Sequence, residues 1–238
     1  MQTTITKKIN LLSPGSTNAK TKKNSIETFI MYLAPANTVT GVNLCPFASD
    51  ECKEVCLYTA GHGAFNSVQL ARINKTKFWR DERKNFYIQL ANELLKIHDK
   101  AIKYNKNIAI RLNGTSDVDH IGLLQRYTGI NFLDEFYNDL IFYDYTKNIN
   151  QIKKYKNTRY NLTFSRSECN ETEVNQALNL GTNIAVVFKN TLPETWQGRP
   201  VINGDLSDLR FLDPKGLIIG LIAKGKARKS NSNFVIQN

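Results

Sequence analysis

Three of the four cysteines in the chain, Cys45, Cys52 and Cys56, lie within twelve positions, in the segment NLCPFASDECKEVC. Thiolates are soft ligands, and three on one short loop in a reducing compartment predict a shared metal centre. Six residues separate the first pair and three separate the second, so the paired Cys-x2-Cys pattern of structural zinc is missing. The spacing therefore favours an iron–sulfur cluster, with zinc as the alternative.

The number of thiols in the loop is one fewer than either metal centre needs. A 4Fe–4S cluster normally takes four cysteines, so three would leave one iron open to a substrate or cofactor. A tetrahedral zinc site would take its fourth ligand from His62 or Cys169. Three unrelated thiols are the alternative without a metal, and a lone Cys169 would then be a small apolar side chain.

Polar residues follow the predicted strand 107–112 in a dense set: Arg111, Asn113, Ser116, Asp117, Asp119 and His120. Asp117, Asp119 and His120 are of types that ligate divalent metals or act as acid and base. The structural alternative is a strand-to-helix turn in which Asp or Ser caps the next helix.

Two similar sets follow later strands. After residues 160–164 come Ser165, Arg166 and Glu168. Arg166 can grip a carboxylate or phosphate through two hydrogen bonds, although a structural Arg–Glu pair is the alternative. The segment GDLSDLRFLDP contributes the third set: Asp205, Asp208 and Arg210. These three are candidates for lining a pocket.

The elements that must position these residues alternate between strands and helices. Apolar runs predict strands at 26–34, 107–112, 140–143, 160–164, 183–188 and 216–222. Apolar residues at three-, four- and seven-residue steps predict one long helix or two over residues 65–104, and a further helix at 171–180. Such alternation predicts a parallel sheet with its chemistry at the carboxyl ends of the strands. The expected fold is α/β, a partial (β/α)6 TIM-like barrel with a metal-binding loop after its first strand.

Composition divides the chain into a basic extended arm over residues 1–24, a single domain over 25–227 and a polar tail over 228–238. Lys and Arg number 32 against 21 Asp and Glu, which gives a net charge of +11. A nucleic-acid partner would account for this charge through phosphate neutralisation, and lysines dispersed over a solvated surface are the alternative. The N-terminus lacks the pattern of a secretory signal, and no apolar run reaches the ~20 residues of a membrane span. We therefore expect a cytoplasmic protein with no membrane partner.

Four segments carry a resemblance to a known family: YLAPANTVTGVNLCPFASDECKEVCLYTAG, AIRLNGTSD, NLTFSRSECNE and GDLSDLRFLDPKGLIIGLIAKGKA. They resemble the bacteriophage "gene product eighty-eight"-like proteins over most of the chain. At fold level that family is similar to the radical S-adenosylmethionine enzymes. The resemblance implies that Cys45, Cys52 and Cys56 ligate a 4Fe–4S cluster whose open iron binds S-adenosylmethionine. It also implies that residues 113–117 lie beside the methionine amino group.

Two features of the sequence differ from those enzymes. Their usual spacing is Cys-x3-Cys-x2-Cys, which is shorter at both gaps, and their Gly-Gly-Glu after the second strand is replaced here by Asn-Gly-Thr-Ser-Asp. Predicted cofactor contacts come from Arg111, Asn113, Ser116, Asp117, Ser165, Arg166 and Glu168. Predicted catalytic groups are Asp119, His120, Asp205, Asp208 and Arg210.

The leading hypothesis is an iron–sulfur phage protein, radical S-adenosylmethionine-like, that acts on or with nucleic acid. One alternative is a nuclease with structural zinc, whose divalent ions are held by Asp117, Asp119, His120, Asp205 and Asp208. The other is a non-enzymatic module that binds nucleic acid or a host protein. The sequence contains no P-loop, dinucleotide fingerprint, Gly-x-Ser-x-Gly or His-Glu-x-x-His motif.

Overall fold

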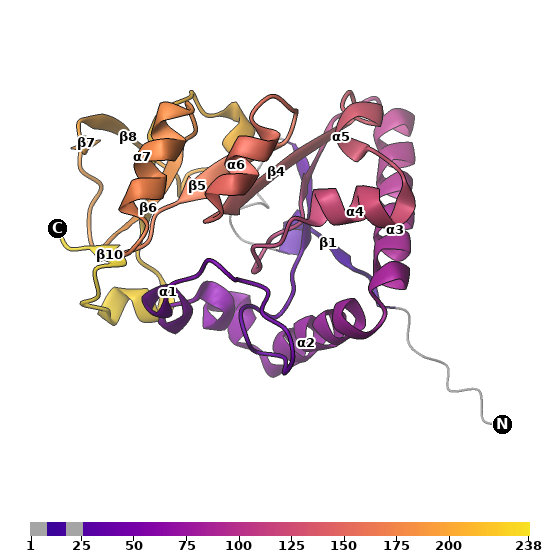
Figure 1. Ribbon diagram of the computed structural model, residues 1–238, viewed down its shortest axis with the longest axis horizontal. Helices are drawn as coiled ribbons and strands as arrows, with labels where there is room; N and C mark the ends of the chain where they lie inside the picture. The colour runs from indigo at the N-terminus through magenta and orange to yellow at the C-terminus, as the bar shows by residue number, and fades with distance from the viewer. Residues whose placement is uncertain (1–8, 18–25) are drawn as a thin grey trace.

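A ten-stranded sheet forms the centre of the computed structural model, which describes residues 9–17 and 26–238 (Figure 1). Its strands are β1 (Leu12–Pro14), β2 (Glu27–Met31), β3 (Ile108–Arg111), β4 (Leu140–Thr146), β5 (Asn161–Ser165), β6 (Ile184–Phe188), β7 (Thr195–Trp196), β8 (Arg199–Asn203), β9 (Ile218–Ile222) and β10 (Val235–Ile236). The order in space is β1-β2-β3-β4-β5-β6-β9-β8-β7, with β10 beside β6. The sheet is open, because β1 and β7 lie at opposite ends of this order.

From β1 to β6, strands that follow one another along the chain are also neighbours in the sheet. β2, β3, β4, β5, β6 and β9 pair in this order and are all parallel, so their carboxyl ends lie at one edge. β8 adds a further parallel strand beside β9. The antiparallel partners are β1 against β2 and β7 against β8. The loops that follow the parallel strands therefore meet along a single edge.

Helices connect these strands. They are α1 (Asp50–Glu54), α2 (Asn66–Asp81), α3 (Arg83–Lys103), α4 (His120–Thr128), α5 (Phe132–Glu135), α6 (Ile149–Tyr155) and α7 (Glu171–Asn179). Short 3-10 turns are η1 (Gly15–Thr17), η3 (Leu57–Thr59), η4 (Gly61–Ala64), η5 (Arg210–Leu212) and η6 (Gly225–Lys229). Figure 1 shows α1 and α2 along one edge of the sheet, with the C-terminal segment next to α1. None of the helices in the described ranges has the length and apolar character that crossing a membrane would require.

The two faces of the sheet are covered differently. One face carries the apolar side chains that α3, α4, α6 and α7 bury, among them Ile110 and Phe142 in one cluster and Phe164 and Ile184 in the other. Leu162 packs against both clusters, which joins them across the sheet. The opposite face is covered around Ala109 and Tyr143 by Leu209 and Phe211 of the loop between β8 and β9. Helices thus cover one face and a loop covers part of the other.

All six strands predicted from apolar runs are present, as β2, β3, β4, β5, β6 and β9. The predicted helical region 65–104 is two helices, because Glu82 between them leaves the helical conformation at φ −131° and ψ 50°. The chain is therefore α/β, as expected.

Strand β4 is longer than its apolar run. Asp144, Tyr145 and Thr146 follow the predicted strand 140–143, but in the structure they are the last residues of β4 and pair with β5. The Asp144 carboxylate fits a strand interior because it accepts hydrogen bonds from the backbone of Leu112 (3.1 Å) and Asn113 (2.8 Å) and from the Tyr160 hydroxyl (2.7 Å). A buried carboxylate with several donors is tolerated where an isolated one would not be.

The predicted ends of the chain also contribute strands. The arm expected over residues 1–24 lies partly outside the described residues, at 1–8 and 18–25. Of its described part, Leu12–Pro14 forms β1, and Glu93 accepts hydrogen bonds from the backbone of Leu11 and Leu12. Within the tail expected over 228–238, Val235–Ile236 forms β10 on β6. These edge strands have two or three residues, which is too short for a periodic signal.

Candidate functional site

The three clustered cysteines line one pocket of about 150 Å3. Cys45 lies on the loop after β2, Cys52 is in helix α1 and Cys56 follows the end of that helix. Ser49 begins α1 as its N-cap, and its hydroxyl accepts a hydrogen bond from the backbone N–H of Cys52 (3.2 Å). The short helix thus folds back the loop and turns three thiols from one segment toward a common space. The remaining pocket lining is Pro35, Ala36, Thr38, Ala48, Lys53, Glu54, Tyr58 and Lys226.

Loops from two other parallel strands bond to the cysteine loop. After β3, the backbone N–H of Asp117 donates to the Leu44 carbonyl at 2.7 Å, and the Thr115 carbonyl lies 3.9 Å from the Cys45 sulfur. After β5, Glu168 accepts a hydrogen bond from the Ser49 hydroxyl at 2.8 Å. The pocket therefore lies at the carboxyl edge of the sheet.

The loops after β4 and β9 complete this arrangement. The Asp117 carboxylate accepts hydrogen bonds from the Thr146 hydroxyl (2.7 Å) and the Lys147 backbone (2.8 Å) at the end of β4. Beyond β9, Lys226 in η6 reaches the pocket wall. The C-terminal segment is anchored nearby, because the Phe234 N–H donates to the Glu51 carboxylate at 2.9 Å.

The electrostatics of the pocket disfavour thiolates unless a cation is present. Burial raises the pKa of the Cys45 thiol to about 12, aided by the charges of Asp117, Cys56 and Cys52 and opposed by a hydrogen bond from the Ala36 backbone. Burial also raises the pKa of Cys56, which a backbone hydrogen bond from Tyr58 and the positive charges of Lys147 and Arg72 lower. Three ionised sulfurs in this space therefore need a compensating positive charge.

The chemistry of this donor set fits a thiophilic metal. Its members are thiols, and backbone N–H groups already donate to two of them: Ala36 to Cys45 at 3.4 Å, and Tyr58 to Cys56. Such N–H···S bonds are among the features that tune iron–sulfur centres. Among residues 9–17 and 26–238, no three His, Cys, Asp or Glu side chains already have the arrangement of metal ligands.

The turn after β3 is held by its own polar groups. The Asn113 side chain accepts hydrogen bonds from the Ser116 hydroxyl (2.8 Å) and the Val118 backbone (3.0 Å) and donates to the Val118 carbonyl (2.9 Å). Asp117 is bound to the end of β4, as described above. These side chains shape the turn, and it is the Thr115 carbonyl that faces the cysteine pocket. Cofactor contacts of Asn113, Ser116 and Asp117 stay predictions.

Asp119 and His120 lie at the start of α4 with separate partners. Asp119 is the N-cap, and its carboxylate accepts hydrogen bonds from Gly122, Lys154 and Tyr155. His120 is fully buried and its Nδ1 lies 2.9 Å from the Tyr87 hydroxyl. Burial lowers the pKa of His120 to about 3, so this histidine is neutral at physiological pH. Neither side chain lines the cysteine pocket.

Arg111 and Asp208 meet on the face of the sheet opposite the helices, at 3.1 Å between Nη1 and Oδ2. Asp208 also accepts a hydrogen bond from the Tyr143 hydroxyl at 3.2 Å. Arg210 forms an ion pair with Asp213 at 3.1 Å. Asp205 lies apart, where it accepts hydrogen bonds from the Ile222 backbone and Lys224. Of the third predicted set, only Asp208 therefore meets a member of the first.

The set after β5 divides between two neighbours. Arg166 donates to the carbonyls of Asn233 and Phe234, which fastens the C-terminal segment to β5. Glu168 bonds to Ser49 of the cysteine loop. Ser165 is the last residue of β5 and pairs with Ala185 of β6. Arg166 and Glu168 each bond to another segment, and the charge of Glu168 also acts on Arg166.

The two proposed fourth ligands, Cys169 and His62, are both exposed. Cys169 lies near the Ser167 hydroxyl at 3.9 Å, and the His62 ring lies 5.9 Å from that of Phe65. Neither lines the cysteine pocket.

Comparison with known proteins places the chain in a family. The model of the gene product 88 family matches residues 5–238, nearly the whole sequence. The chain belongs to the gene product 88 family. No match was found among curated proteins or among solved structures.

The cations around the cysteine pocket of this gene product 88 family member were missed by sequence reasoning. Lys147 and Arg72 act electrostatically on Cys56, and Lys226 lines the pocket. The Arg72 guanidinium lies over the rings of Tyr32 and Tyr58, at 4.8 and 5.4 Å from their centroids. Lys147 directly follows β4, so its place at a strand's carboxyl end was the available signal. Arg72 in α2 and Lys226 in η6 are far from Cys56 in sequence, so only the folded structure shows that they lie near the pocket.

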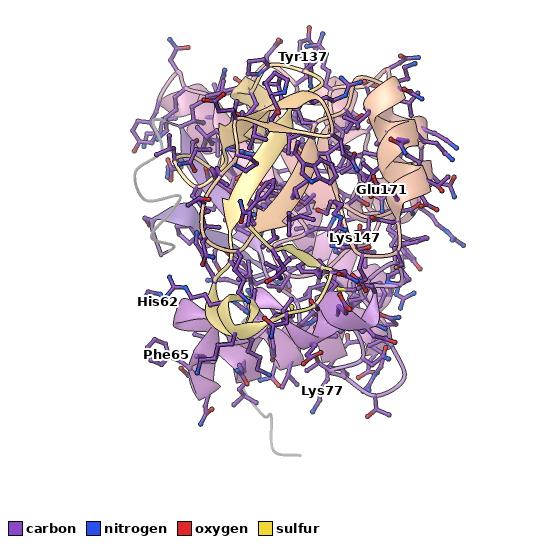
Figure 2. All side chains as sticks on the ribbon, turned by 90° about the vertical axis from the view of Figure 1, so that its left-hand side faces the viewer. His62, Phe65, Lys77, Tyr137, Lys147 and Glu171 are labelled. Atoms are coloured by element: carbon purple, nitrogen blue, oxygen red, sulfur yellow. The ribbon has the colours of Figure 1, made fainter. Side chains whose placement is uncertain are left out.

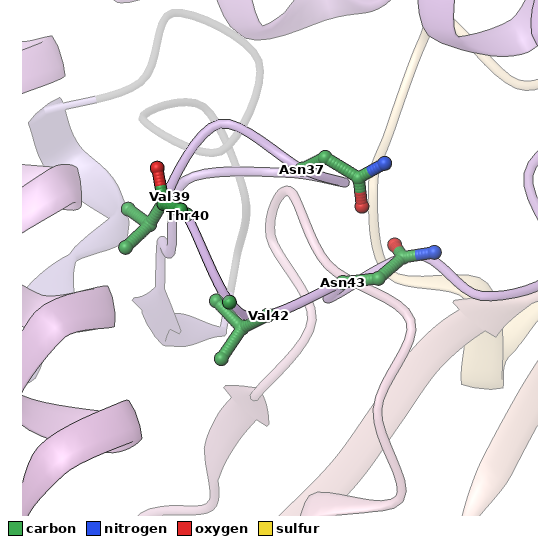
Figure 3. A pocket seen from close by; sticks show the side chains of 6 residues that line it. Asn37, Val39, Thr40, Val42 and Asn43 are labelled. Carbon is green, nitrogen blue, oxygen red and sulfur yellow. The ribbon is translucent and has the colours of Figure 1, made fainter.

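A larger hollow, of about 500 Å3, lies along the loop that leads from β2 to Cys45 (Figure 3). Its lining is Asn37, Val39, Thr40, Gly41, Val42 and Asn43. Figure 3 shows the amides of Asn37 and Asn43 directed to the same side. This lining comes from a single loop and has no ionisable side chain, so the smaller pocket with the thiols is the candidate site of the family member.

Proposed function

We propose that Cys45, Cys52 and Cys56 hold a 4Fe–4S cluster, and that this gene product 88 family member is a radical S-adenosylmethionine-like enzyme. The observation that carries the proposal is the convergence of three thiols from one loop on one pocket at the carboxyl edge of parallel strands. Parallel α/β sheets place their active sites at this edge. When bound, such a cluster supplies one electron for cleavage of the sulfonium of S-adenosylmethionine.

The strand order supports a partial (β/α)6 barrel. Six parallel strands, β2 to β6 and β9, are neighbours in chain order, and helices α3, α4, α6 and α7 pack on one face. A barrel wall has this arrangement, whereas a doubly wound sheet reverses its strand order and carries helices on both faces. The cysteine loop follows β2, the first of these strands.

Three kinds of group in the chain would hold the cluster: thiols, backbone N–H groups and positively charged side chains. The three thiols bind iron, and the backbone N–H groups of Ala36 and Tyr58 stabilise the sulfurs. Lys147 and Arg72 offset negative charge near Cys56. A cysteine side chain has a single torsion between its backbone and its sulfur, so χ1 is the torsion that would orient each thiol toward a metal.

Anaerobic purification followed by iron and sulfide analysis tests the metal half of this proposal. We expect about four irons per chain and an absorbance near ~400 nm that reduction bleaches. A colourless protein with one zinc per chain would overturn it and leave the cysteines as a structural clip.

The enzymatic half has its own readout. Reduced protein with S-adenosylmethionine should release 5′-deoxyadenosine and methionine, and Cys52→Ala protein should release neither. A brown protein that never cleaves S-adenosylmethionine would contradict the enzymatic half while leaving the cluster in place.

A further inference from the structure

Two distant segments of the chain meet beside the cysteine pocket. The turn η6 packs against η3, and a Cβ built on Gly225 would lie 3.0 Å from the Cβ of Ala60. Gly225 also has a positive φ of 55°, so a larger residue there would strain both the backbone and this contact. We call this the η3–η6 surface. Its side chains are Leu57, His62, Phe65, Lys226, Arg228 and Lys229.

The η3–η6 surface exposes large apolar side chains. Leu57 is 58% and Phe65 is 59% exposed. The His62 ring lies against Phe65, with centroids 5.9 Å apart. Figure 2 shows both rings at the rim of the molecule, on the side where the pale yellow C-terminal turn lies. Exposed aromatic rings are the groups on which unpaired bases stack.

The same surface carries positive charge. Lys224, just before η6, forms an ion pair with Asp205 at 2.6 Å. Lys226, Arg228 and Lys229 are exposed and form no ion pair with any carboxylate among the described residues. The whole chain carries a net charge of +11. Cations without acidic partners next to exposed rings complement a phosphate backbone with accessible bases.

The surface leads directly to the thiols, since Lys226 and Tyr58 line the same pocket as Cys45, Cys52 and Cys56. We infer that the η3–η6 surface binds single-stranded nucleic acid and presents a nucleotide to the cysteine pocket. A duplex keeps its base faces stacked internally, so only an unpaired strand offers them to Phe65 while its phosphates meet the basic turn. The inference rests on the proposed function for the reaction at the pocket, but binding itself does not require the cluster.

The test is a binding titration with fluorescein-labelled strands of about 20 nucleotides of mixed sequence, as DNA, RNA and duplex DNA. The charge variant is Lys226→Glu, Arg228→Glu, Lys229→Glu. Its matched control, Lys84→Glu, Lys96→Glu, Lys103→Glu, makes the same change in net charge on α3, which Figure 1 shows on the opposite side of the molecule. Phe65→Ala is paired with Tyr104→Ala, an aromatic residue that is 58% exposed at the end of α3. Iron content and visible absorbance are recorded for every variant.

We expect wild-type protein to prefer a single strand to the duplex. The η6 triple variant should lose at least tenfold in affinity and lower the salt slope of log K by about 2, as loss of three phosphate contacts predicts. Phe65→Ala should lose about tenfold, within the range for one stacked base. The α3 triple and Tyr104→Ala should bind like wild type. The DNA and RNA arms identify the natural strand.

Equal losses in the η6 and α3 triple variants would overturn the inference, because the effect would then follow net charge alone. Equal or tighter binding of the duplex would overturn it too. A colourless wild-type protein that binds single strands through η6 would contradict the proposed cluster and support the surface. A brown protein that binds no single strand would support the proposed cluster and contradict the binding surface.

Discussion

The cysteine loop and the aspartates are both candidate metal sites in the sequence, but the fold arranges their side chains in opposite ways. Cys45, Cys52 and Cys56 converge on one pocket. The aspartate set is Asp117, Asp119, Asp205 and Asp208. Each of its members has hydrogen-bonding or charged partners supplied by the protein, in a different place. Convergence on a shared space, and not density along the sequence, distinguishes a candidate site from a set of structural contacts.

The difference has a physical basis. A buried carboxylate is stable only with donors or a cation, so the fold must supply partners for the buried Asp117 and Asp208, and it also pairs the half-buried Asp119 and Asp205. A thiol tolerates burial as a small apolar group until it ionises. Three neutral thiols are therefore stable in a pocket before a metal binds, whereas buried carboxylates without partners are not.

The largest stability effect is expected from Asp208→Ala. This change removes the 3.1 Å partner of the largely buried Arg111 guanidinium, which keeps only Asp144 at 3.8 Å. Removing one member of a buried pair typically costs about 3 to 5 kcal/mol, and we expect a loss at the lower end of that range because Asp144 stays. Urea denaturation measures the free energy of unfolding. If Asp208 is structural, the double variant Arg111→Met, Asp208→Leu should recover much of the loss. If Asp208→Ala protein were as stable as wild type, the Arg111–Asp208 ion pair would not have a structural role.

A smaller effect is expected from acid at His120. Its pKa is about 3 in the folded protein against an ordinary value near 6.5, so below pH 6.5 the unfolded chain takes up a proton that the folded one does not. Stability linked to His120 is therefore complete above pH 6.5 and falls as the pH drops toward 3. Between pH 7 and pH 5 wild-type protein should lose about 2 kcal/mol more than His120→Gln protein. Denaturation at both pH values measures this difference.

The matched control is His62→Gln, which removes a histidine at an exposed position and leaves His120 in place. If His120→Gln protein lost stability with acid as steeply as wild type, His120 would not be a buried neutral side chain. His120 would then have to be treated as an accessible group that could take part in a functional site.

The smallest effect is expected from Ser49→Ala. The hydroxyl caps α1 and donates to Glu168, and loss of an N-cap costs about 1 kcal/mol. The loop that carries the thiols should loosen without unfolding the protein, so iron should be lost faster to a chelator. Ser67→Ala, at an exposed serine in the first turn of α2, serves as the control. Equal iron loss from both variants would show that the Ser49 cap does not stabilise the cysteine loop.

Much of the fold could be predicted from the sequence because its parallel strands are buried apolar runs separated by helices. The edge strands could not, since β7 and β10 have two residues each. The cysteines could be grouped because they share one short segment. The ion-pair partners of the aspartates could not be predicted from the sequence, because they lie at distant positions: Lys154 for Asp119 and Arg111 for Asp208. Lys226 joins the pocket for the same reason, through a fold-dependent contact.

Iron content across a matched series of anaerobically purified variants tests the central claim most directly. Cys45→Ser, Cys52→Ser and Cys56→Ser should each lose the cluster, whereas Cys169→Ser, Asp119→Asn and Asp205→Asn should keep wild-type iron, about four per chain. Iron retained by all three pocket variants, or lost from the folded aspartate variants to the same extent, would contradict a metal centre held by Cys45, Cys52 and Cys56.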